Sequence, residues 1–304
     1  ADRVGLPSLL LFLLVGVVIG NDGLGLDFSD VQLASDLGTT ALAVILVEGG
    51  LTTRFANIRR LLAPAAVLAT VGVAVSMAVI AVAAHLLLGI SWQLAFLLGA
   101  IVSPTDAAAV FSILRVLPLP RRVAGLLEAE SGFNDAPAAI VVLMLSTTPL
   151  VIDPVHAIGG VFYELIAGSA IGLLAGLLGA MMLRRAALPA SGLYPLATFG
   201  LAMVAFAAAS SVHASGFIAA YLSGVVLANS GLPHRAAIRS FAEGLGWLAQ
   251  IGLFVLLGLL PLYTPDILDT PGVSFGGTMA QFAMVAIIAI GLNVVVGQAG
   301  LLDL

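Results

Sequence analysis

Long apolar runs alternate with short polar stretches along the whole chain. A helix that crosses the hydrocarbon core of a bilayer needs about 20 apolar residues, and the runs reach or approach that length. They do not alternate between apolar and polar residues at every second position, as the strands of a membrane barrel must. The pattern therefore predicts about ten transmembrane helices, over residues 6–20, 36–51, 62–88, 92–114, 123–147, 157–183, 193–211, 214–229, 242–262 and 278–300.

Composition supports a protein that lies almost entirely in a membrane. The 304 residues are 61% hydrophobic and 9% charged, whereas an ordinary soluble domain is about a quarter charged. The chain has no cysteine, which excludes disulfides and thiolate metal sites, and its four histidines show no ligand spacing. We expect an all-α polytopic membrane protein that is not an enzyme. Its partner is the lipid bilayer, and we expect neither a cofactor nor a nucleic-acid partner.

The distribution of charge predicts an orientation. All eleven basic residues are arginine. If the predicted helices alternate in direction, every arginine falls on one side of the membrane, and loop acids such as Asp22, Asp153 and Asp266 fall on the other. Cytoplasmic loops of membrane proteins carry the excess of basic residues. We therefore expect a multi-pass protein whose arginine-bearing loops are cytoplasmic.

A stripe of glycine runs along the predicted helix 157–183. Gly168, Gly172 and Gly176 recur at every fourth position and so share one face of that helix. Small residues let membrane helices approach closely. The stripe fits either packing inside the bundle or a face that meets a second copy of the chain in a homodimer.

Two polar clusters interrupt the apolar runs and hold the candidate chemistry. They are SPTDAAAV at Ser103–Val110 and EAESGFNDAPA at Glu128–Ala138. A charged side chain at the bilayer centre costs roughly 2.5–3.5 kcal/mol on insertion scales. Asp135 nevertheless falls at the midpoint of its predicted helix, and Asp106 falls about 5 Å from the midpoint of its own. These groups indicate an ion site; the alternative is a protonated aspartate that joins neighbouring helices for stability.

The first cluster contains a predicted helix break. Pro104 removes a backbone donor and its ring clashes with the preceding turn, so the helix over 92–114 should break there. Broken helices at membrane depth line protein cavities, where they offer carbonyl oxygens and helix ends to ions. Thr105 offers a hydroxyl and a carbonyl, and Asp106 offers a carboxylate. These hard oxygen ligands suit a small monovalent cation.

The second cluster places four polar residues on the helix predicted over 123–147. Ser131 and Asp135 are four positions apart and share one face, as do Glu130 and Asn134. We predict that Asp135 and Ser131 bind one cation together with the oxygen ligands of the preceding helix. Glu130 and Asn134 then form a supporting hydrogen-bonded pair. A carboxylate that holds either a proton or a cation, but not both, is sufficient to couple their exchange.

These residues resemble a known family. SPTDAAAVFSILR and ESGFNDAPA are similar to the Thr-Asp and Glu-Ser-Gly-x-Asn-Asp motifs of NhaP-type monovalent cation/proton antiporters. GAIVSPTDAAAVFSILR, SGFIAAYLSGVVLANSGLPHR and GWLAQIGLFVLLGLL are similar to the potassium/proton branch of that family. The resemblance covers residues of about 4–260. It implies exchange of K+ or Na+ for H+ by alternating access, in the inner (plasma) membrane of a bacterium.

The resemblance also implies roles for individual residues. Asp135 would be the alternating proton and cation carrier, with Thr105, Asp106 and Ser131 as cation ligands. Asn134 and its neighbour Glu130 would be the supporting polar pair. An Asn-Asp pair, in place of two aspartates, implies electroneutral exchange of one cation for one proton.

The end of the chain departs from this family. The antiporter fold is an inverted repeat whose second broken helix crosses the first, and no such helix follows 242–262. We therefore expect an incomplete inverted-repeat antiporter fold, with one family helix also missing before residue 6. Residues 263–277 are rich in Pro, Asp, Thr and Gly and are expected to be a linker.

The last segment, 278–304, resembles the opening helix of LivM-type permease subunits of branched-chain amino-acid ABC transporters, through AIGLNVVVGQAGLLDL. The predicted organisation is thus an antiporter-like domain over 1–262, a linker, and one extra transmembrane helix. Two alternatives stay open. One is a permease subunit, which needs a longer cytoplasmic loop for an ATPase than any arginine-bearing loop offers. The other is an inactive truncated or fused membrane fragment.

Overall fold

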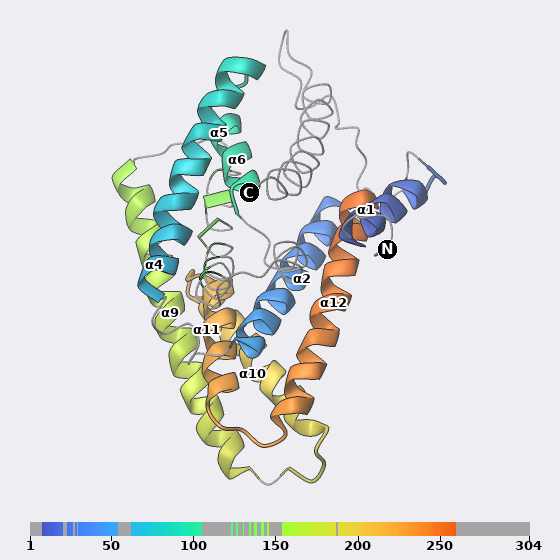
Figure 1. Ribbon diagram of the computed structural model, residues 1–304, viewed down its shortest axis with the longest axis vertical. Helices are drawn as coiled ribbons and strands as arrows, with labels where there is room; N and C mark the ends of the chain where they lie inside the picture. Colours follow the sequence, from blue (N-terminus) through green and yellow to red (C-terminus); the bar gives the residue numbers. More distant parts are fainter. Residues whose placement is uncertain are drawn as a thin grey trace. The chain divides into compact units, whose positions relative to one another are not determined.

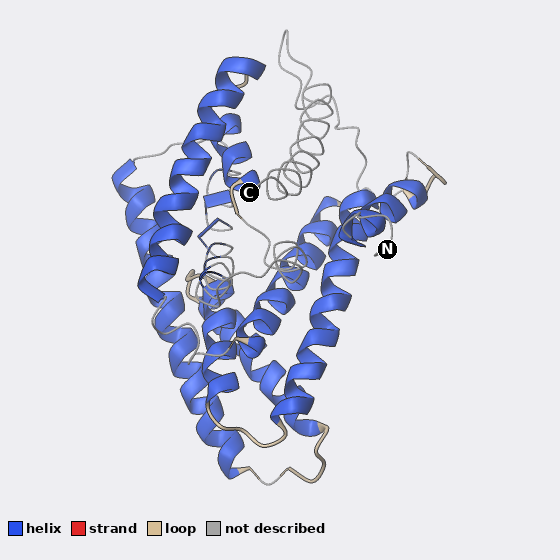
Figure 2. Cartoon of the chain, viewed as in Figure 1, coloured by secondary structure: helices blue, strands red, loops and turns tan. Residues whose placement is uncertain are grey.

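A computed structural model shows the architecture of the chain (Figure 1). Every regular element in the part that it describes is a helix, and that part contains no strand (Figure 2). The all-α fold class is therefore confirmed. The described residues are 8–20, 23–26, 28, 30–53, 62–104, 154–186 and 188–259, with nine separate positions at 123, 126, 130, 134, 137, 138, 141, 142 and 145.

The helices follow the predicted apolar runs. Five of those described are long and apolar enough to cross a membrane, and two shorter apolar helices accompany them. The nine described positions of the predicted helix 123–147 are all helical, whereas 278–300 lies outside the described residues. The elements are α1 (Ser8–Ile19), α2 (Val31–Thr52), α4 (Leu62–Val67), η1 (Leu68–Gly72), α5 (Val73–Leu88), α6 (Trp92–Val102), α9 (Pro154–Arg185), α10 (Leu193–Ser211), α11 (Gly216–Asn229) and α12 (Arg235–Leu259).

Helix α12 begins seven residues before the predicted span 242–262. Its first two turns contain Arg235, Arg239 and Ser240, and hydropathy alone assigns them to a loop. Arg239 and Glu243 form an i,i+4 ion pair near this end of the helix, with the Arg239 Nε atom 2.8 Å from Glu243 Oε1. Such pairs stabilise a helix, so α12 continues beyond its apolar run.

The chain divides into two compact units, and each is described here by itself. The first unit comprises residues 1–31 and 254–304. Within it α1 meets the last turns of α12 through Gly16 and Gly258, and a Cβ atom on either glycine would collide with the backbone of the other helix. The predicted domain boundary at residue 262 lies outside the described residues.

The second unit, residues 32–253, contains the most closely packed helices. Helix α11 packs against both α9 and α10. A Cβ atom on Gly172 of α9 would lie 2.6 Å from the Ala219 carbonyl oxygen of α11, and one on Gly168 would lie 2.5 Å from that of Ser215. The glycine stripe that ends at Gly176 therefore faces α11. Packing inside the bundle is the correct interpretation of the stripe, and its use as a homodimer face is wrong.

Helix α2 crosses α11 with similarly close contact. A Cβ atom on Gly224 would lie 3.0 Å from the Val47 carbonyl oxygen and 3.2 Å from the Gly50 Cα atom. Just beyond this crossing, the Asn229 Nδ2 atom donates a hydrogen bond of 2.9 Å to the Thr53 carbonyl oxygen. The end of α2 is thus tied to the end of α11.

Helices α5 and α6 form a hairpin in the same unit. Gly89 closes the turn at φ +67°, a left-handed conformation that glycine adopts without steric cost. The His85 ring stacks on the Trp92 ring at 4.0 Å between centroids, and its Nδ1 atom lies 2.7 Å from the Ile90 carbonyl oxygen. The hairpin therefore has an aromatic contact at its closed end.

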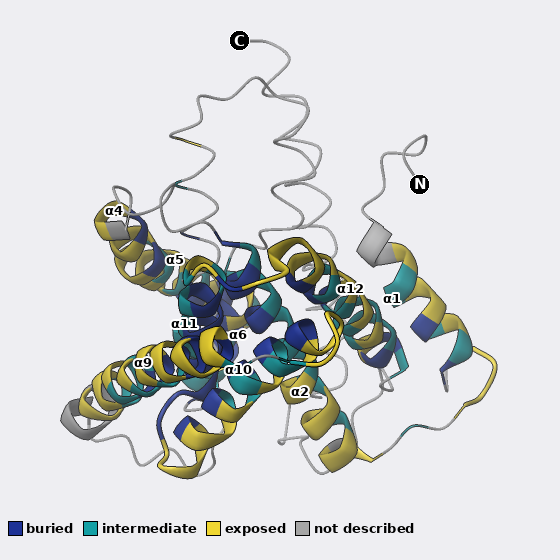
Figure 3. Cartoon of the chain, turned by 90° about the horizontal axis from the view of Figure 1, so that it is seen from below, coloured by how far each residue is buried: buried dark blue, intermediate teal, exposed yellow. Residues whose placement is uncertain are grey.

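Burial separates the inner helix from the outer ones (Figure 3). Most residues of α11 are buried, whereas α5 exposes apolar side chains such as Val75 and Val79, which are 58% and 63% exposed. Apolar side chains in that position face lipid when the helix spans a membrane. The burial pattern is that of a bundle built for a bilayer.

Candidate functional site

Helix α6 leads to the first polar cluster. The Ser91 hydroxyl caps its N-terminus by accepting a hydrogen bond of 3.4 Å from the Leu94 backbone N–H. The helix ends at Val102, and Ser103 and Pro104 follow in a bend. The Ser103 hydroxyl donates to the Gly99 carbonyl oxygen at 2.5 Å, so it satisfies one carbonyl of the last turn.

Two of the predicted site residues lie in the described part of the second cluster. Glu130 and Asn134 are both buried, with 9% and 0% of their surface exposed. The Asn134 Nδ2 atom donates a hydrogen bond of 3.0 Å to Glu130 Oε1. A buried polar group needs such a partner because an unsatisfied one costs about 1–3 kcal/mol. The role of this pair at an ion site stays a prediction.

The four predicted cation ligands, Thr105, Asp106, Ser131 and Asp135, lie outside the described residues. In the part that is described, no group of three or more His, Asp or Glu side chains could hold a metal ion. The cation site itself therefore also stays a prediction.

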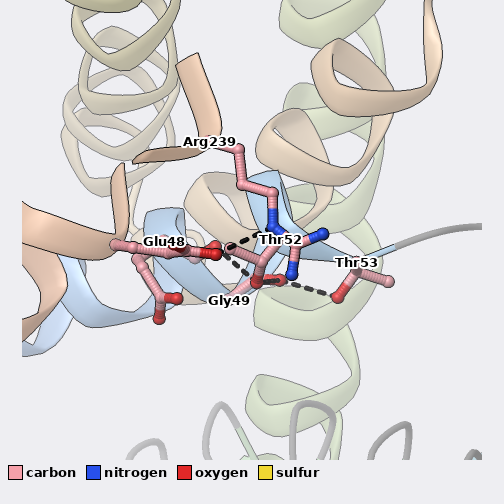
Figure 4. Close-up of polar contacts among 6 residues, drawn as sticks. Glu48, Gly49, Thr52, Thr53 and Arg239 are labelled. Atoms are coloured by element: carbon pink, nitrogen blue, oxygen red, sulfur yellow. Dashed lines mark hydrogen bonds and ion pairs between the residues drawn. The ribbon is translucent and has the colours of Figure 1, made fainter. Parts of the chain in front are cut away.

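A charged group outside the two polar motifs lies where α2 approaches α12 (Figure 4). The Glu48 side chain of α2 lies against Gly246 of α12, where a Cβ atom would be 2.6 Å from Glu48 Cγ. Its charged neighbours are Glu243 and Arg239, also on α12. Positions 239, 243 and 246 share one face of a helix. Their spacing could have indicated this group only if the helix had been predicted to begin near Arg235 and not at residue 242.

The end of α2 satisfies its own carbonyl groups (Figure 4). The Thr52 hydroxyl donates to the Glu48 carbonyl oxygen at 3.0 Å, and the Thr53 hydroxyl donates to that of Gly49 at 2.6 Å. These side chains therefore serve the helix backbone, and the Glu48 carboxylate receives no hydrogen bond from them.

Comparison with known proteins agrees with the motifs. A family model described as "Sodium/hydrogen exchanger, transmembrane" matches residues 1–298. The match includes most of the segment 278–304 whose sequence resembles a permease helix, and that second resemblance stays unconfirmed.

Several curated relatives are named as antiporters. The chain is 37% identical to the K(+)/H(+) antiporter NhaP2 of Shewanella baltica over 289 residues, and 39% identical to the K(+)/H(+) antiporter NhaP of Alkalimonas amylolytica over 294 residues. Each match covers 93% of this chain and 50% of the relative. The Na(+)/H(+) antiporter NhaS2 of Synechocystis is 28% identical over 75% of this chain and 43% of that protein. The chain thus spans about half the length of the K(+)/H(+) relatives.

A solved structure has the same fold. The sodium proton antiporter MjNhaP1 from Methanocaldococcus jannaschii superimposes with a TM-score of 0.71 at 23% identity, over 85% of this chain and 65% of that one. The expected antiporter fold is therefore confirmed, although the number of ten helices is not established.

Proposed function

The chain belongs to the sodium/hydrogen exchanger family, and we propose that its protein exchanges a monovalent cation for H+ across the membrane by alternating access. The observation that carries this proposal is the family match over residues 1–298. Such a protein is a transporter and not an enzyme. We propose K+ as the first cation to test, with Na+ second, because the relatives that are 37% and 39% identical are named K(+)/H(+) antiporters.

In this proposal one cation binds at Asp135, Asp106, Thr105 and Ser131. Asp135 holds either the cation or a proton, and exchange of one for the other gives electroneutral transport. The helix break at Pro104 supplies backbone oxygen atoms to the same place.

The positions of Pro104 and Asn134 along their helices support a shared site for the two polar clusters. Gln93, near the start of α6, donates a hydrogen bond of 3.1 Å to the Leu145 carbonyl oxygen. Pro104 follows Gln93 by eleven residues, and Asn134 precedes Leu145 by eleven residues. Each helical residue advances about 1.5 Å, so antiparallel helices bring Pro104 and Asn134 to the same depth, about 16 Å from that hydrogen bond.

The buried Glu130–Asn134 pair supports the proposal in a second way. Polar side chains in membrane helices are costly and usually functional. The pair occupies the helix face next to the one on which the sequence places Ser131 and Asp135. We assign Glu130 and Asn134 the role of positioning that face.

We place the protein in a bacterial inner membrane with its arginine-bearing loops in the cytoplasm. The arginines that the structure describes support a position on one common side of the membrane. Arg184 and Arg185 end α9, and α12 begins at Arg235. These ends are neighbours, since the Tyr194 hydroxyl donates to the Ala186 carbonyl oxygen at 2.9 Å and the Tyr194 ring lies 5.2 Å from the His234 ring. Lipid is the expected partner, and a homodimer would use a surface other than the glycine stripe.

The test is proton flux in vesicles that contain the full-length protein and an internal pH-sensitive dye. Addition of K+ should move protons, and Asp135→Asn should abolish that flux while membrane insertion stays normal. Asp153→Asn, in a predicted outer turn, is the matched control and should leave the flux unchanged. Normal K+- and Na+-dependent flux in Asp135→Asn would overturn the proposal.

The two alternatives have separate readouts. A permease subunit would co-purify with an ATPase, and an inactive fragment would give no flux when residues 1–304 alone are placed in the same vesicles. No observation on the described residues favours the permease.

A further inference from the structure

Three charged side chains gather where the end of α2 meets the first turns of α12. We call Glu48, Arg239 and Glu243 the charge cluster; Figure 4 labels Glu48 and Arg239. Positions 239, 243 and 246 share one face of α12, and this face meets α2. Because residue 246 is glycine, the Glu48 side chain lies directly on the α12 backbone: a Cβ atom on Gly246 would be 2.6 Å from Glu48 Cγ and 3.2 Å from its carboxyl carbon.

The charge cluster has two carboxyl groups for one guanidinium. Arg239 Nε donates to Glu243 Oε1 at 2.8 Å, and these two side chains are 48% and 45% exposed. Glu48 is half-buried. Among the described residues, its carboxylate has no hydrogen bond and no ion pair, although Glu243 and Arg239 are its charged neighbours.

In the part of the chain that the structure describes, the other elements near Glu48 offer no second cation. Helix α11 contains no Asp, Glu, Lys, Arg or His. Its titratable side chain on this side is Tyr221, whose ring would lie 3.8 Å from a Cβ atom on Gly49. The other acid of α2, Asp36, is three turns away and accepts a hydrogen bond of 3.0 Å from Gln32. Arg239 is therefore the cation that the described structure offers to Glu48.

An ionised carboxylate without a cation is unfavourable inside a membrane helix. Glu48 has two ways to avoid that state: it can bind a proton, or it can take Arg239 as its partner. Arg239 is exposed enough to turn from Glu243 toward α2, and Glu243 is exposed enough for water to solvate it once it is released.

We propose that the charge cluster is a pH-sensitive latch between α2 and α12. At low pH, Glu48 carries a proton and Arg239 stays on Glu243. As pH rises, Glu48 releases one proton to water and its carboxylate accepts a hydrogen bond from the Arg239 guanidinium. The closed latch links α12 to α2, which Asn229 already ties to α11. The latch concerns a contact between helices and does not depend on which ion the protein carries.

The chain offers its own reporter of this contact. It has two tryptophans, Trp92 and Trp247, and Trp247 adjoins Gly246. The variant Trp92→Phe, with any tryptophan of the full-length protein outside these 304 residues also replaced by phenylalanine, leaves Trp247 as the single emitter. We expect its emission, in the full-length protein in vesicles, to change in one sigmoidal step as the pH is raised.

Four further variants, each in the Trp92→Phe background, assign that step. Glu48→Gln should remove it. Glu243→Gln removes a like charge and frees Arg239, so the midpoint should move to lower pH; Arg239→Gln removes the cation, so the midpoint should move to higher pH. Each shift should be about one pH unit or more. Arg235→Gln is the matched control, because Arg235 bonds the Ala228 carbonyl oxygen at 2.8 Å, and its midpoint should stay unchanged.

A second measurement uses thermal stability. The double-mutant cycle of Glu48→Gln and Arg239→Gln should show coupling at a pH above the emission step and none at a pH below it. A parent without the step, a step that survives Glu48→Gln, or an equal shift in Arg235→Gln would each overturn the latch. None of these readouts measures ion flux, so failure of the latch is distinct from failure of the proposed exchange.

Discussion

Helices α9 and α11 approach each other through glycine and alanine, whereas the segment with the second polar motif buries a hydrogen-bonded polar pair. In the first region, Gly172 lies against Ala219 so closely that no side chain would fit. In the second, Asn134 is fully buried and donates to Glu130. Both regions are largely apolar in composition, so the difference lies in which contacts occupy the interior.

This difference follows from the solvent. Lipid is as apolar as leucine, so close packing of small residues, and not burial of apolar surface, joins helices in a membrane. Polar side chains are costly there and persist where they serve a function. The α9–α11 contact is therefore a scaffold, and in our proposal the polar pair belongs to the transport machinery. Substitutions should separate the two, with loss of folding in one region and loss of flux per folded molecule in the other.

The largest effect on folding is expected from Gly172→Val. Its branched side chain would meet the α11 backbone, where a Cβ atom already lies 2.6 Å from the Ala219 carbonyl oxygen. Overpacking of this kind typically costs about 1–3 kcal/mol and occasionally more. We expect a large loss of monodisperse protein in detergent, measured by size-exclusion chromatography and thermal unfolding.

Gly200→Ala is the matched control for Gly172→Val. It also replaces a helical glycine, but no atom lies within 4 Å of its added Cβ. Alanine is the better helix former by about 0.5–1 kcal/mol, so stability should stay equal or rise. If Gly172→Val unfolds no more easily than Gly200→Ala, the α9–α11 contact is not the scaffold.

An intermediate effect is expected from Asn134→Ala. It removes the donor 3.0 Å from Glu130 Oε1, and a buried acceptor that loses a partner costs about 1–3 kcal/mol. Because the pair positions the ion-binding face in our proposal, K+-dependent proton flux per folded protein should fall further than stability does. Equal flux per folded molecule in Asn134→Ala and wild type would assign the pair to the scaffold.

The sequence predicts these regions to different extents, for physical reasons. Helix spans depend on apolar length, so α10, and the continuous stretch of α4, η1 and α5, follow the predicted runs closely. The Glu130–Asn134 bond follows from i,i+4 spacing alone. The start of α12 could not be predicted from apolar length, because the pair that stabilises it, Arg239 and Glu243, is charged.

Contacts between distant segments are the least predictable. Glu48 lies against Gly246 although almost 200 positions separate them, and no local pattern joins these two residues. The glycine stripe lies between local features, which spacing predicts, and contacts of distant segments, which it does not. Its spacing indicated a close contact, but only the structure identifies α11 as the partner.

The smallest effect should come from Asn229→Ala, which tests how firmly α2 belongs to the scaffold. The substitution removes the bond of 2.9 Å to the Thr53 carbonyl oxygen and the bond of 2.7 Å to the Val225 carbonyl oxygen within α11, but it leaves the contact of Gly50 with Gly224 intact. A typical hydrogen bond contributes about 0.5–1.5 kcal/mol, so a small fall in unfolding temperature is expected. Ser211→Ala, which removes a hydrogen bond of 2.8 Å within the exposed end of α10, is the control and should change less. If Asn229→Ala destabilises the protein as much as Gly172→Val, the side-chain tie outweighs the glycine crossing, and the division between packed scaffold and polar machinery fails at α2.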